Sequence, residues 1–363
     1  MKIAIVTYYF YPDITPRAFR AFELAKQFAR QNHDVVVVTR NRNFDYAHIT
    51  KDYKFIIDAR LENINIIPTS KNKLLKITKH LISHYFLYPQ ILLIPSIVKV
   101  LKTYTDYDLV LTIAHPFAIH FGTSISKYIN PLLCRSWIAD CGDPFSGNKE
   151  TRIKPPWYYK IIENIFFSNV SHITVPIESA VVAYGGNLRE KIKVIPQGFE
   201  IRKNTSNPKE FDINAIEFAY AGVLGLNLRD PTNLLNHLIK TNANFKFTIY
   251  TENKEILNFY IKKLKGRLIV KSYIPRELLL DELAKMDFLI NFENKNSQQS
   301  PSKLIDYAII GRPVLSIPHK CNNFEDFDMF MRGDFSKSTK LPNIYDHDIQ
   351  VVANKFLNLV SGK

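Results

Sequence analysis

Cysteine is scarce in this sequence, and long hydrophobic runs are missing. The 363 residues include three cysteines, Cys134, Cys141 and Cys321, whose wide spacing fits neither a metal site nor a disulfide framework. Such usage is typical of a reducing cytoplasm. No apolar run reaches the ~18–20 residues that span a bilayer, and no signal peptide is apparent before the strand-like residues 2–7. We therefore expect a cytoplasmic protein, and peripheral attachment to the inner face of the membrane stays open.

Familiar catalytic and nucleotide-binding motifs are also missing. The sequence contains no P-loop, no HExxH, no CxxC pair, no Gly-x-Gly-x-x-Gly and no Ser-His-Asp order of a known hydrolase. The one Asp-x-Asp candidate, Asp106-Tyr-Asp108, opens a predicted strand rather than following one. The sequence therefore predicts a site without a bound metal or cofactor.

The composition is that of a folded protein with an excess of positive charge. Hydrophobic residues make up 46% of the chain and aromatic residues 13%, which argues against disorder. The length exceeds that of a typical single core and predicts two domains. The net charge is +14, from 48 basic and 34 acidic residues.

Much of this charge lies between Asn63 and Thr105, a segment without any acidic residue. Leucine, isoleucine, tyrosine and phenylalanine are interleaved there with six lysines, namely Lys71, Lys73, Lys76, Lys79, Lys99 and Lys102. The pattern suits an anionic membrane surface. An amphipathic helix that packs on its own domain and keeps its lysines in water explains it nearly as well. We expect no nucleic-acid partner, although basic segments occur at such interfaces too.

Short apolar runs alternate with helical patterns along the chain, which predicts an α/β protein with parallel sheets. Strands are predicted first at 2–7, 34–39, 63–68, 108–114, 135–139, 172–175 and 192–195, and after a polar linker at 218–221, 245–250, 268–270, 288–291 and 314–317. We therefore predict two Rossmann-like domains, 1–202 and 203–345, facing a central cleft. A C-terminal helix at 346–363 is expected to pack back on the first domain.

The segment 298–317 combines a polar loop, a short helix and a buried strand. Ser302 suits the N-cap and Gly311 the position just past the helix end, where Pro313 stops its continuation. A helix N-terminus offers free N–H groups to an anion. Lys303 and Asp306 lie in the first turns of this helix, and Gln298 precedes it. This arrangement fits a nucleotide diphosphate whose sugar hydroxyls need acceptors, although a capped helix beside a core strand explains it equally well.

The segment resembles the donor-binding signature of retaining family 4 glycosyltransferases, which have the GT-B fold. That signature has two glutamates separated by seven residues and ends in Ala-x-Gly-x-Pro-Val. Asp306 matches the second glutamate, Gly311-Arg-Pro-Val314 matches the ending, and Gln298 stands in place of the first glutamate. The resemblance implies that Asp306 binds the ribose and that Gln298 faces the donor sugar.

Two further segments resemble the same family. Ile195-Pro-Gln-Gly-Phe-Glu200 is similar to the close of its first domain, and the segment from Gly222 to Arg229 is similar to the opening of its second domain. There the family has two cations that neutralise the donor diphosphate. Arg229 matches one of them, and Val223 stands where the other is expected. The resemblance therefore implies diphosphate contacts from Gly222 and Arg229, and Lys303 is a candidate for the missing charge.

Candidate residues on the acceptor side follow predicted strands of the first domain. The family has a histidine near the donor sugar, which implies this role for His115 or His120. Asp140 and Asp143 resemble a family turn that orients the acceptor hydroxyl, although an Asx turn explains them equally well. Arg17 and Arg20 begin the first helix, where many members have two glycines, and a guanidinium there pairs well with phosphate.

These observations and the resemblance predict a metal-independent glycosyltransferase of the hexosyltransferase type, and the resemblance alone implies that it is retaining. It would move a sugar from a UDP- or GDP-sugar to a lipid-linked or envelope saccharide, as in lipopolysaccharide, capsule or other polysaccharide biosynthesis. Two alternatives stay open. One is a nucleotide-sugar epimerase or hydrolase with the same fold. The other is a catalytically degenerate scaffold that binds a nucleotide or a partner of its basic segment, which Gln298 and Val223 favour.

Overall fold

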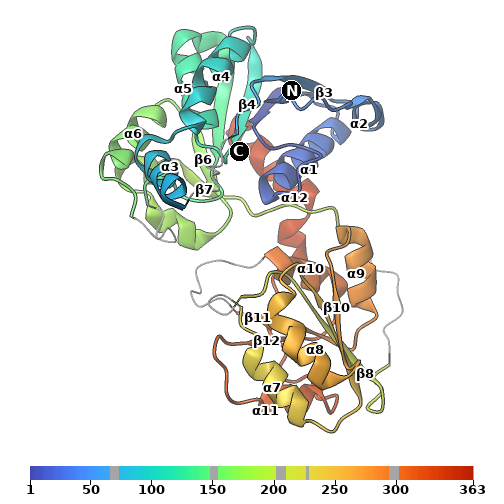
Figure 1. Cartoon of the computed structure of the whole chain (residues 1–363). Coiled ribbons are helices and arrows are strands. Elements are labelled where there is room, and N and C mark those ends of the chain that lie inside the picture. Colours follow the sequence, from blue (N-terminus) through green and yellow to red (C-terminus); the bar gives the residue numbers. More distant parts are fainter. Residues whose placement is uncertain (66–72, 148–153, 202–209, 226–228, 294–301, 363) are drawn as a thin grey trace. The chain divides into compact units, whose positions relative to one another are not determined.

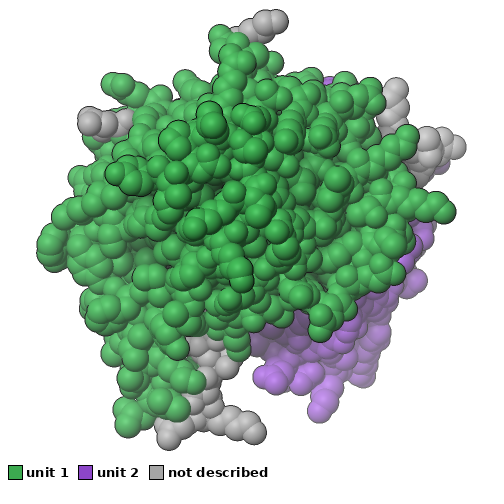
Figure 2. All heavy atoms as spheres, turned by 90° about the horizontal axis from the view of Figure 1, so that it is seen from above, with its two compact units in different colours: residues 1–200, 346–363 green, residues 201–345 purple. Residues whose placement is uncertain are grey.

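The chain folds into two compact units, which are described separately below (Figures 1 and 2). Unit 1 comprises residues 1–200 and 346–363, and unit 2 comprises residues 201–345. A computed structural model describes residues 1–65, 73–147, 154–201, 210–225, 229–293 and 302–362. The side chains of Lys73, Asn187, Ser302 and Lys303 lie outside the described atoms.

Unit 1 is built on a seven-stranded parallel sheet in the order β3-β2-β1-β4-β5-β6-β7. The strands are β1 (Lys2–Thr7), β2 (Asp34–Arg40), β3 (Ile56–Leu61), β4 (Tyr107–Ile113), β5 (Cys134–Asp140), β6 (His172–Val175) and β7 (Ile192–Val194). The central strands are apolar on both faces because helices cover both sides. The order reverses between β1 and β4, so their carboxyl ends flank the crevice where such sheets bind ligands.

The helices of unit 1 form one layer on each face of the sheet. On one face, α4 (Leu93–Leu101) and α5 (Ala118–Ile129) pack on Val6, Val110 and Trp137. On the other, α1 (Pro16–Arg30) and α12 (Ile349–Ser361) pack on Ile3 and Ile5. The other α-helices among the described residues of the unit are α2 (Ala47–Tyr53), α3 (Lys73–Phe86) and α6 (Tyr158–Phe166).

One predicted strand lies elsewhere in the structure. The segment 63–68 was expected to be a strand, but the strand is β3 at Ile56–Leu61, and residues 66–68 lie outside the described range. β3 is an edge strand, paired only with β2 among the described strands. An edge strand tolerates charged residues, so Asp58 and Arg60 can interrupt its apolar pattern. Because of these two residues, the apolar periodicity of the sequence did not indicate a strand here.

Unit 2 repeats the architecture with a five-stranded parallel sheet in the order β10-β9-β8-β11-β12. Its strands are β8 (Ile216–Ala221), β9 (Phe245–Tyr250), β10 (Leu268–Lys271), β11 (Phe288–Phe292) and β12 (Val314–Ile317). Helices α7 (Thr232–Lys240), α8 (Asn258–Leu264) and α11 (Glu325–Phe330) cover one face. Helices α9 (Arg276–Ala284) and α10 (Ser302–Ile310) cover the other. The predicted α/β fold with two Rossmann-like domains is confirmed.

Within the described residues, no single helix is long and apolar enough to cross a membrane. The segments Leu74–Phe86 and Gln90–Leu101 meet the criterion only as a pair, bent by 52°.

Candidate functional site

The candidate nucleotide site lies at the carboxyl edge of the unit 2 sheet, where the strand order reverses between β8 and β11. Gly222 follows β8 with a φ of 145°, a conformation that side chains rarely adopt. A Cβ at this position would lie 3.0 Å from the Tyr220 hydroxyl oxygen. Glycine therefore leaves the backbone of this turn open to a close approach by a ligand.

Two tyrosines hold the turn and α10 in place. Tyr307, in α10, donates a hydrogen bond to the Ile290 carbonyl (3.2 Å) and accepts one from the Ala221 N–H (3.1 Å). Tyr220 donates to the Val223 carbonyl at 2.8 Å. Burial raises the pKa of both phenols, so both keep the proton that these bonds require. Tyr307 thus ties α10 to the end of β8, directly before the turn at Gly222.

Arg229 brings positive charge to the same edge. Its backbone pairs with Gly225 in both directions, at 3.0 and 3.2 Å, so it ends the loop that leaves β8. Its guanidinium charge opposes the burial-driven rise in the pKa of Tyr220 and of Tyr307, which places it near both rings. A cation in this position suits the diphosphate role that the sequence implies.

Asp306 is held by an arginine that the sequence argument missed. Arg276, at the start of α9, donates from Nε (2.9 Å) and Nη2 (2.6 Å) to the same oxygen, Oδ1. Among the described residues, Oδ2 accepts no hydrogen bond, and the side chain is 24% exposed. Burial raises the pKa of this carboxyl, and Arg276 counteracts the rise. The arrangement leaves one carboxylate oxygen available to a hydroxyl group.

The remaining donor-side candidates are only partly described. Gln298 lies outside the described residues, and Ser302 and Lys303 belong to α10 but their side chains lie outside the described atoms. The N-cap bond expected from Ser302 therefore stays a prediction. The expected end of the helix is confirmed, because Gly311 has a φ of 74° and its N–H bonds to the Tyr307 carbonyl at 3.0 Å.

In unit 1, Arg20 and Asp140 form a buried ion pair, and each side chain is 1% exposed. Arg20 donates from Nε to Oδ2 and from Nη2 to Oδ1, both at 2.7 Å, and also to the carbonyls of Ile195 and Pro196. Thr174 donates to Oδ1 at 2.7 Å. The direct ligand contacts expected for Arg20 and Asp140 are not available in this arrangement. The pair instead ties α1 to β5, β6 and the segment after β7.

Arg17, His115 and Asp143 lie on the solvent side of this pair. Arg17 approaches Asp140 at 3.4 Å, and a Cβ at Gly142 would lie 1.5 Å from its Nη2 atom. His115 and Asp143 are exposed. Desolvation by neighbouring protein atoms lowers the pKa of His115, the Asp143 charge raises it, and the Arg17 charge lowers it, so the three groups interact. The imidazole is therefore neutral near pH 7 and accessible.

His120 has a different environment, although it follows His115 by only five residues, within α5. It is 0% exposed, with Nδ1 2.8 Å from the Thr112 hydroxyl and Nε2 3.5 Å from the Cys141 sulfur. Burial lowers its pKa to about 3, so the ring is neutral. Direct contact with a sugar is not available to this enclosed side chain. Of the two histidines that the sequence left open, the structure exposes His115.

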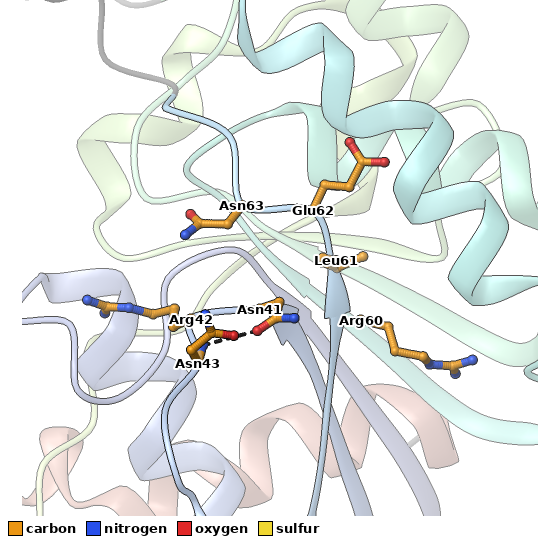
Figure 3. Close-up of a pocket in the computed structure, with 7 residues that line it drawn as sticks. All are labelled: Asn41, Arg42, Asn43, Arg60, Leu61, Glu62 and Asn63. Atoms are coloured by element: carbon orange, nitrogen blue, oxygen red, sulfur yellow. Dashed lines mark hydrogen bonds between the residues drawn. The ribbon is translucent and has the colours of Figure 1, made fainter.

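A shallow polar groove of about 410 Å³ opens at the ends of β2 and β3 (Figure 3), and the sequence argument missed it. Its lining residues are Asn41, Arg42, Asn43, Arg60, Leu61, Glu62 and Asn63. Asp13, in the loop after β1, accepts hydrogen bonds from Arg42 and from the neighbouring Arg40. Amide and guanidinium groups of this kind suit a hydroxyl-rich or anionic ligand.

Within the part of the chain that the structure describes, no cluster of three or more His, Cys, Asp or Glu side chains is arranged to hold a metal ion.

Comparison with known proteins identifies the fold. No family model matches the sequence, and no curated protein matches it. Among solved structures, the apo lipopolysaccharide outer core galactosyltransferase WaaB has a TM-score of 0.63 at 14% identity, with 100% of this chain and 99% of that chain covered. HepE from Anabaena, in complex with UDP and glucose, has a TM-score of 0.64 at 12% identity, with 100% of both chains covered.

A glycosyltransferase from Rickettsia africae has a TM-score of 0.66 at 11% identity, with 99% of this chain and 98% of that chain covered. Identities of this size establish architecture only. The coverage of nearly all of both chains shows that the two units correspond to those of GT-B glycosyltransferases. The chain therefore has the GT-B fold.

Proposed function

We propose that this protein is a glycosyltransferase that uses a nucleotide diphosphate sugar. The observation that carries the proposal is that Gly222, Arg229 and Asp306 belong to the loop after β8 and to α10, which the bond from the Ala221 N–H to Tyr307 ties together. An open turn, a cation and a carboxylate at a topological switch point are the groups that a ribose and a diphosphate need. HepE, which shares the fold, was solved with UDP and glucose.

Each of these groups has a distinct role in the proposed site. Arg229 and the first backbone N–H groups of α10 bind the diphosphate, and Oδ2 of Asp306 accepts a hydrogen bond from a ribose hydroxyl. When the bond from the sugar to the diphosphate breaks, the leaving group gains negative charge, and a preplaced cation stabilises that charge. Protein cations thus supply what a metal supplies in other transferases. The proposed reaction is accordingly metal-independent, and its retention of anomeric configuration rests on the family resemblance.

Unit 1 is proposed to supply the acceptor side and the contact with the donor sugar. His115, Arg17 and Asp143 form an accessible polar cluster at the end of the sheet, and the groove beside Asn63 adds amide and guanidinium groups. Such a surface suits a lipid-linked or envelope saccharide. Arg20 and Asp140 position this edge from within, and His120 supports it as a neutral core residue.

The test measures turnover of UDP-, GDP-, ADP- and CMP-sugars by the full chain in EDTA, with and without a bacterial lipid extract. The proposal predicts release of one nucleoside diphosphate that depends on added acceptor. Asp306→Asn should lower turnover at least about tenfold, the equivalent of about 1.4 kcal/mol. Glu282→Gln, which removes another ion-paired carboxylate of unit 2, should leave it unchanged.

Other outcomes would favour the alternatives. Turnover of the donor without any acceptor indicates an epimerase or hydrolase. Nucleotide binding without turnover indicates a degenerate scaffold, and Gln298→Glu should then raise activity if only the missing carboxylate limits it.

A further inference from the structure

Helix α3 exposes an unusual amount of apolar surface. Seven of its large hydrophobic side chains are exposed, and Leu74 (74%) and Phe86 (68%) are the most exposed of them. The other five are Leu75, Ile77, Leu81, Ile82 and Tyr85. A helix of a globular domain normally buries one apolar stripe against the core. Exposed apolar patches of this extent mark surfaces that are covered by something else.

The helix is fixed to unit 1 by polar contacts at its C-terminal end. The hydroxyls of Tyr158 and Tyr159 donate to the carbonyls of Tyr85 and His84, and the His84 ring lies 3.0 Å from the Lys154 carbonyl. These bonds place α3 beside α6, as Figure 1 shows. These bonds use hydroxyl groups and backbone carbonyls, and the side chains of Ile77 and Leu81 on the same helix are exposed.

The elements next to α3 also expose apolar side chains. On and beside α6, Trp157 is 79%, Ile161 50% and Ile165 61% exposed. Ile91 and Leu92, which follow α3 in the short helix η1 (Gln90–Leu92), are exposed as well. We call α3, α6, Trp157 and η1 the α3–α6 surface.

The same elements carry exposed positive charge. Lys76 on α3 and Lys160 on α6 are exposed, and the sequence has no acidic residue between Asn63 and Thr105. The acid of α6, Glu163, is buried and accepts hydrogen bonds from the Ser146 hydroxyl and N–H. Lysines around exposed Leu, Ile and Trp complement an anionic headgroup layer above acyl chains. A second copy of the chain would instead bring lysines against lysines across a twofold interface.

We propose that the α3–α6 surface binds the face of an anionic lipid bilayer, with α3 lying in the plane of the headgroups. Its 14 residues give a length of about 21 Å at 1.5 Å per residue, which is shorter than the hydrocarbon core of about 30 Å. The helix that would complete a bent span, α4, buries Leu93 and Ile97 in the core of unit 1. The segment therefore lies on the membrane and does not cross it.

The test is co-sedimentation of the full chain with phosphatidylcholine vesicles, with and without phosphatidylglycerol, in low and in high salt. Binding should need the anionic lipid and fall in high salt. Lys76→Gln and Lys160→Gln should each weaken it about fivefold. Ile77→Ser with Leu81→Ser should weaken it at least about tenfold, without unfolding the chain, because both side chains are exposed.

A matched control comes from α8 in unit 2, which also exposes apolar and basic residues. Phe259→Ser with Lys262→Gln and Lys263→Gln changes the same residue types away from the proposed surface. This variant should bind the vesicles like the wild type. If it loses as much binding as the α3 variants do, the attraction is unspecific and the assignment is wrong.

Tryptophan fluorescence provides a second, local readout. The chain has two tryptophans, and Trp137 is fully buried whereas Trp157 lies in the α3–α6 surface. Brominated lipids should quench Trp157, and Trp157→Phe should abolish the quenching. No vesicle binding, or binding without quenching, would overturn the proposal. So would self-association in solution, or binding to a DNA oligonucleotide, that the α3 substitutions abolish. None of these assays uses a sugar donor, so their failure leaves the proposed transferase activity untouched.

Discussion

Replacing Asp140 by asparagine should destabilise unit 1 strongly. The measurement distinguishes a positioning role of the Asp140 carboxylate from a catalytic role. The carboxylate is 1% exposed and accepts three hydrogen bonds of 2.7 Å, two from Arg20 and one from Thr174. Asparagine keeps the shape but removes the charge, so the Arg20 guanidinium stays buried without a counter-ion.

Removing one partner of a buried ion pair costs about 3–5 kcal/mol. Arg20 also keeps its bonds to the carbonyls of Ile195 and Pro196, so we expect the lower half of that range. For a unit of this size, each kcal/mol lowers Tm by about 2–4 °C, which gives a fall of roughly 6–16 °C. Burial disfavours the charged carboxylate, but Arg20 and Arg17 outweigh it and lower the pKa of Asp140. The stabilisation of unit 1 by the Asp140 carboxylate is therefore fully present above pH ~4, the pKa of an aspartate in the unfolded chain, and is lost only in stronger acid.

Thermal unfolding followed by tryptophan fluorescence measures this effect in unit 1 alone. Both tryptophans belong to unit 1, and buried Trp137 lies in the same strand as Asp140. Asp143→Asn, at an exposed position in the following turn, is the matched control and should shift the transition little. If Asp140→Asn unfolds like the wild type but abolishes transfer, the carboxylate acts on the substrate and the positioning role is refuted.

Three further predictions concern individual side chains. Burial lowers the pKa of His120 to about 3, so below pH ~6.5 the unfolded state binds a proton that the folded state does not. The free energy of unfolding of unit 1 should therefore fall by up to about 1.4 kcal/mol per pH unit as the solution is acidified. Unfolding followed by tryptophan fluorescence at several acidic pH values checks this, and His120→Gln should flatten the dependence on pH. Gly142→Ala would put a Cβ 1.5 Å from Arg17 Nη2 and should displace that guanidinium. The rate of sugar transfer should fall at least about tenfold, with little change in Tm. Unchanged activity would exclude a role for Arg17 in transfer. Arg276→Gln removes the charge that counteracts the burial-driven rise in the pKa of Asp306, so this carboxyl should protonate more readily. Calorimetry should then show that nucleotide affinity falls more steeply on acidification than it does in the wild type.

Local patterns were sufficient to predict most of the fold. The apolar run of β2 and the alternation along β9 identified buried strands because each strand contributes its own signal. Gly311 marked the end of α10 because only the local backbone decides that conformation. The edge strand β3 escaped because it lies at the border of the sheet and tolerates charge.

The environment of each candidate side chain was harder to predict, because it depends on residues distant in sequence. His115 and His120 differ by five positions, yet one is exposed and the other is enclosed by Thr112 and Cys141. Arg276 meets Asp306 across 30 residues, and Arg20 meets Asp140 across 120. A single sequence carries no periodic signal for such pairs, so their roles emerged only from the packed structure.

Calorimetric titration of the full chain with UDP, GDP, ADP and CMP in EDTA tests the central claim most directly. One diphosphate should bind without metal, and Asp306→Asn and Arg229→Gln should each weaken it at least about tenfold, or about 1.4 kcal/mol. Glu282→Gln should leave the affinity unchanged. Binding that both site substitutions leave intact, or that appears only when a divalent metal replaces EDTA, would contradict the proposed donor site.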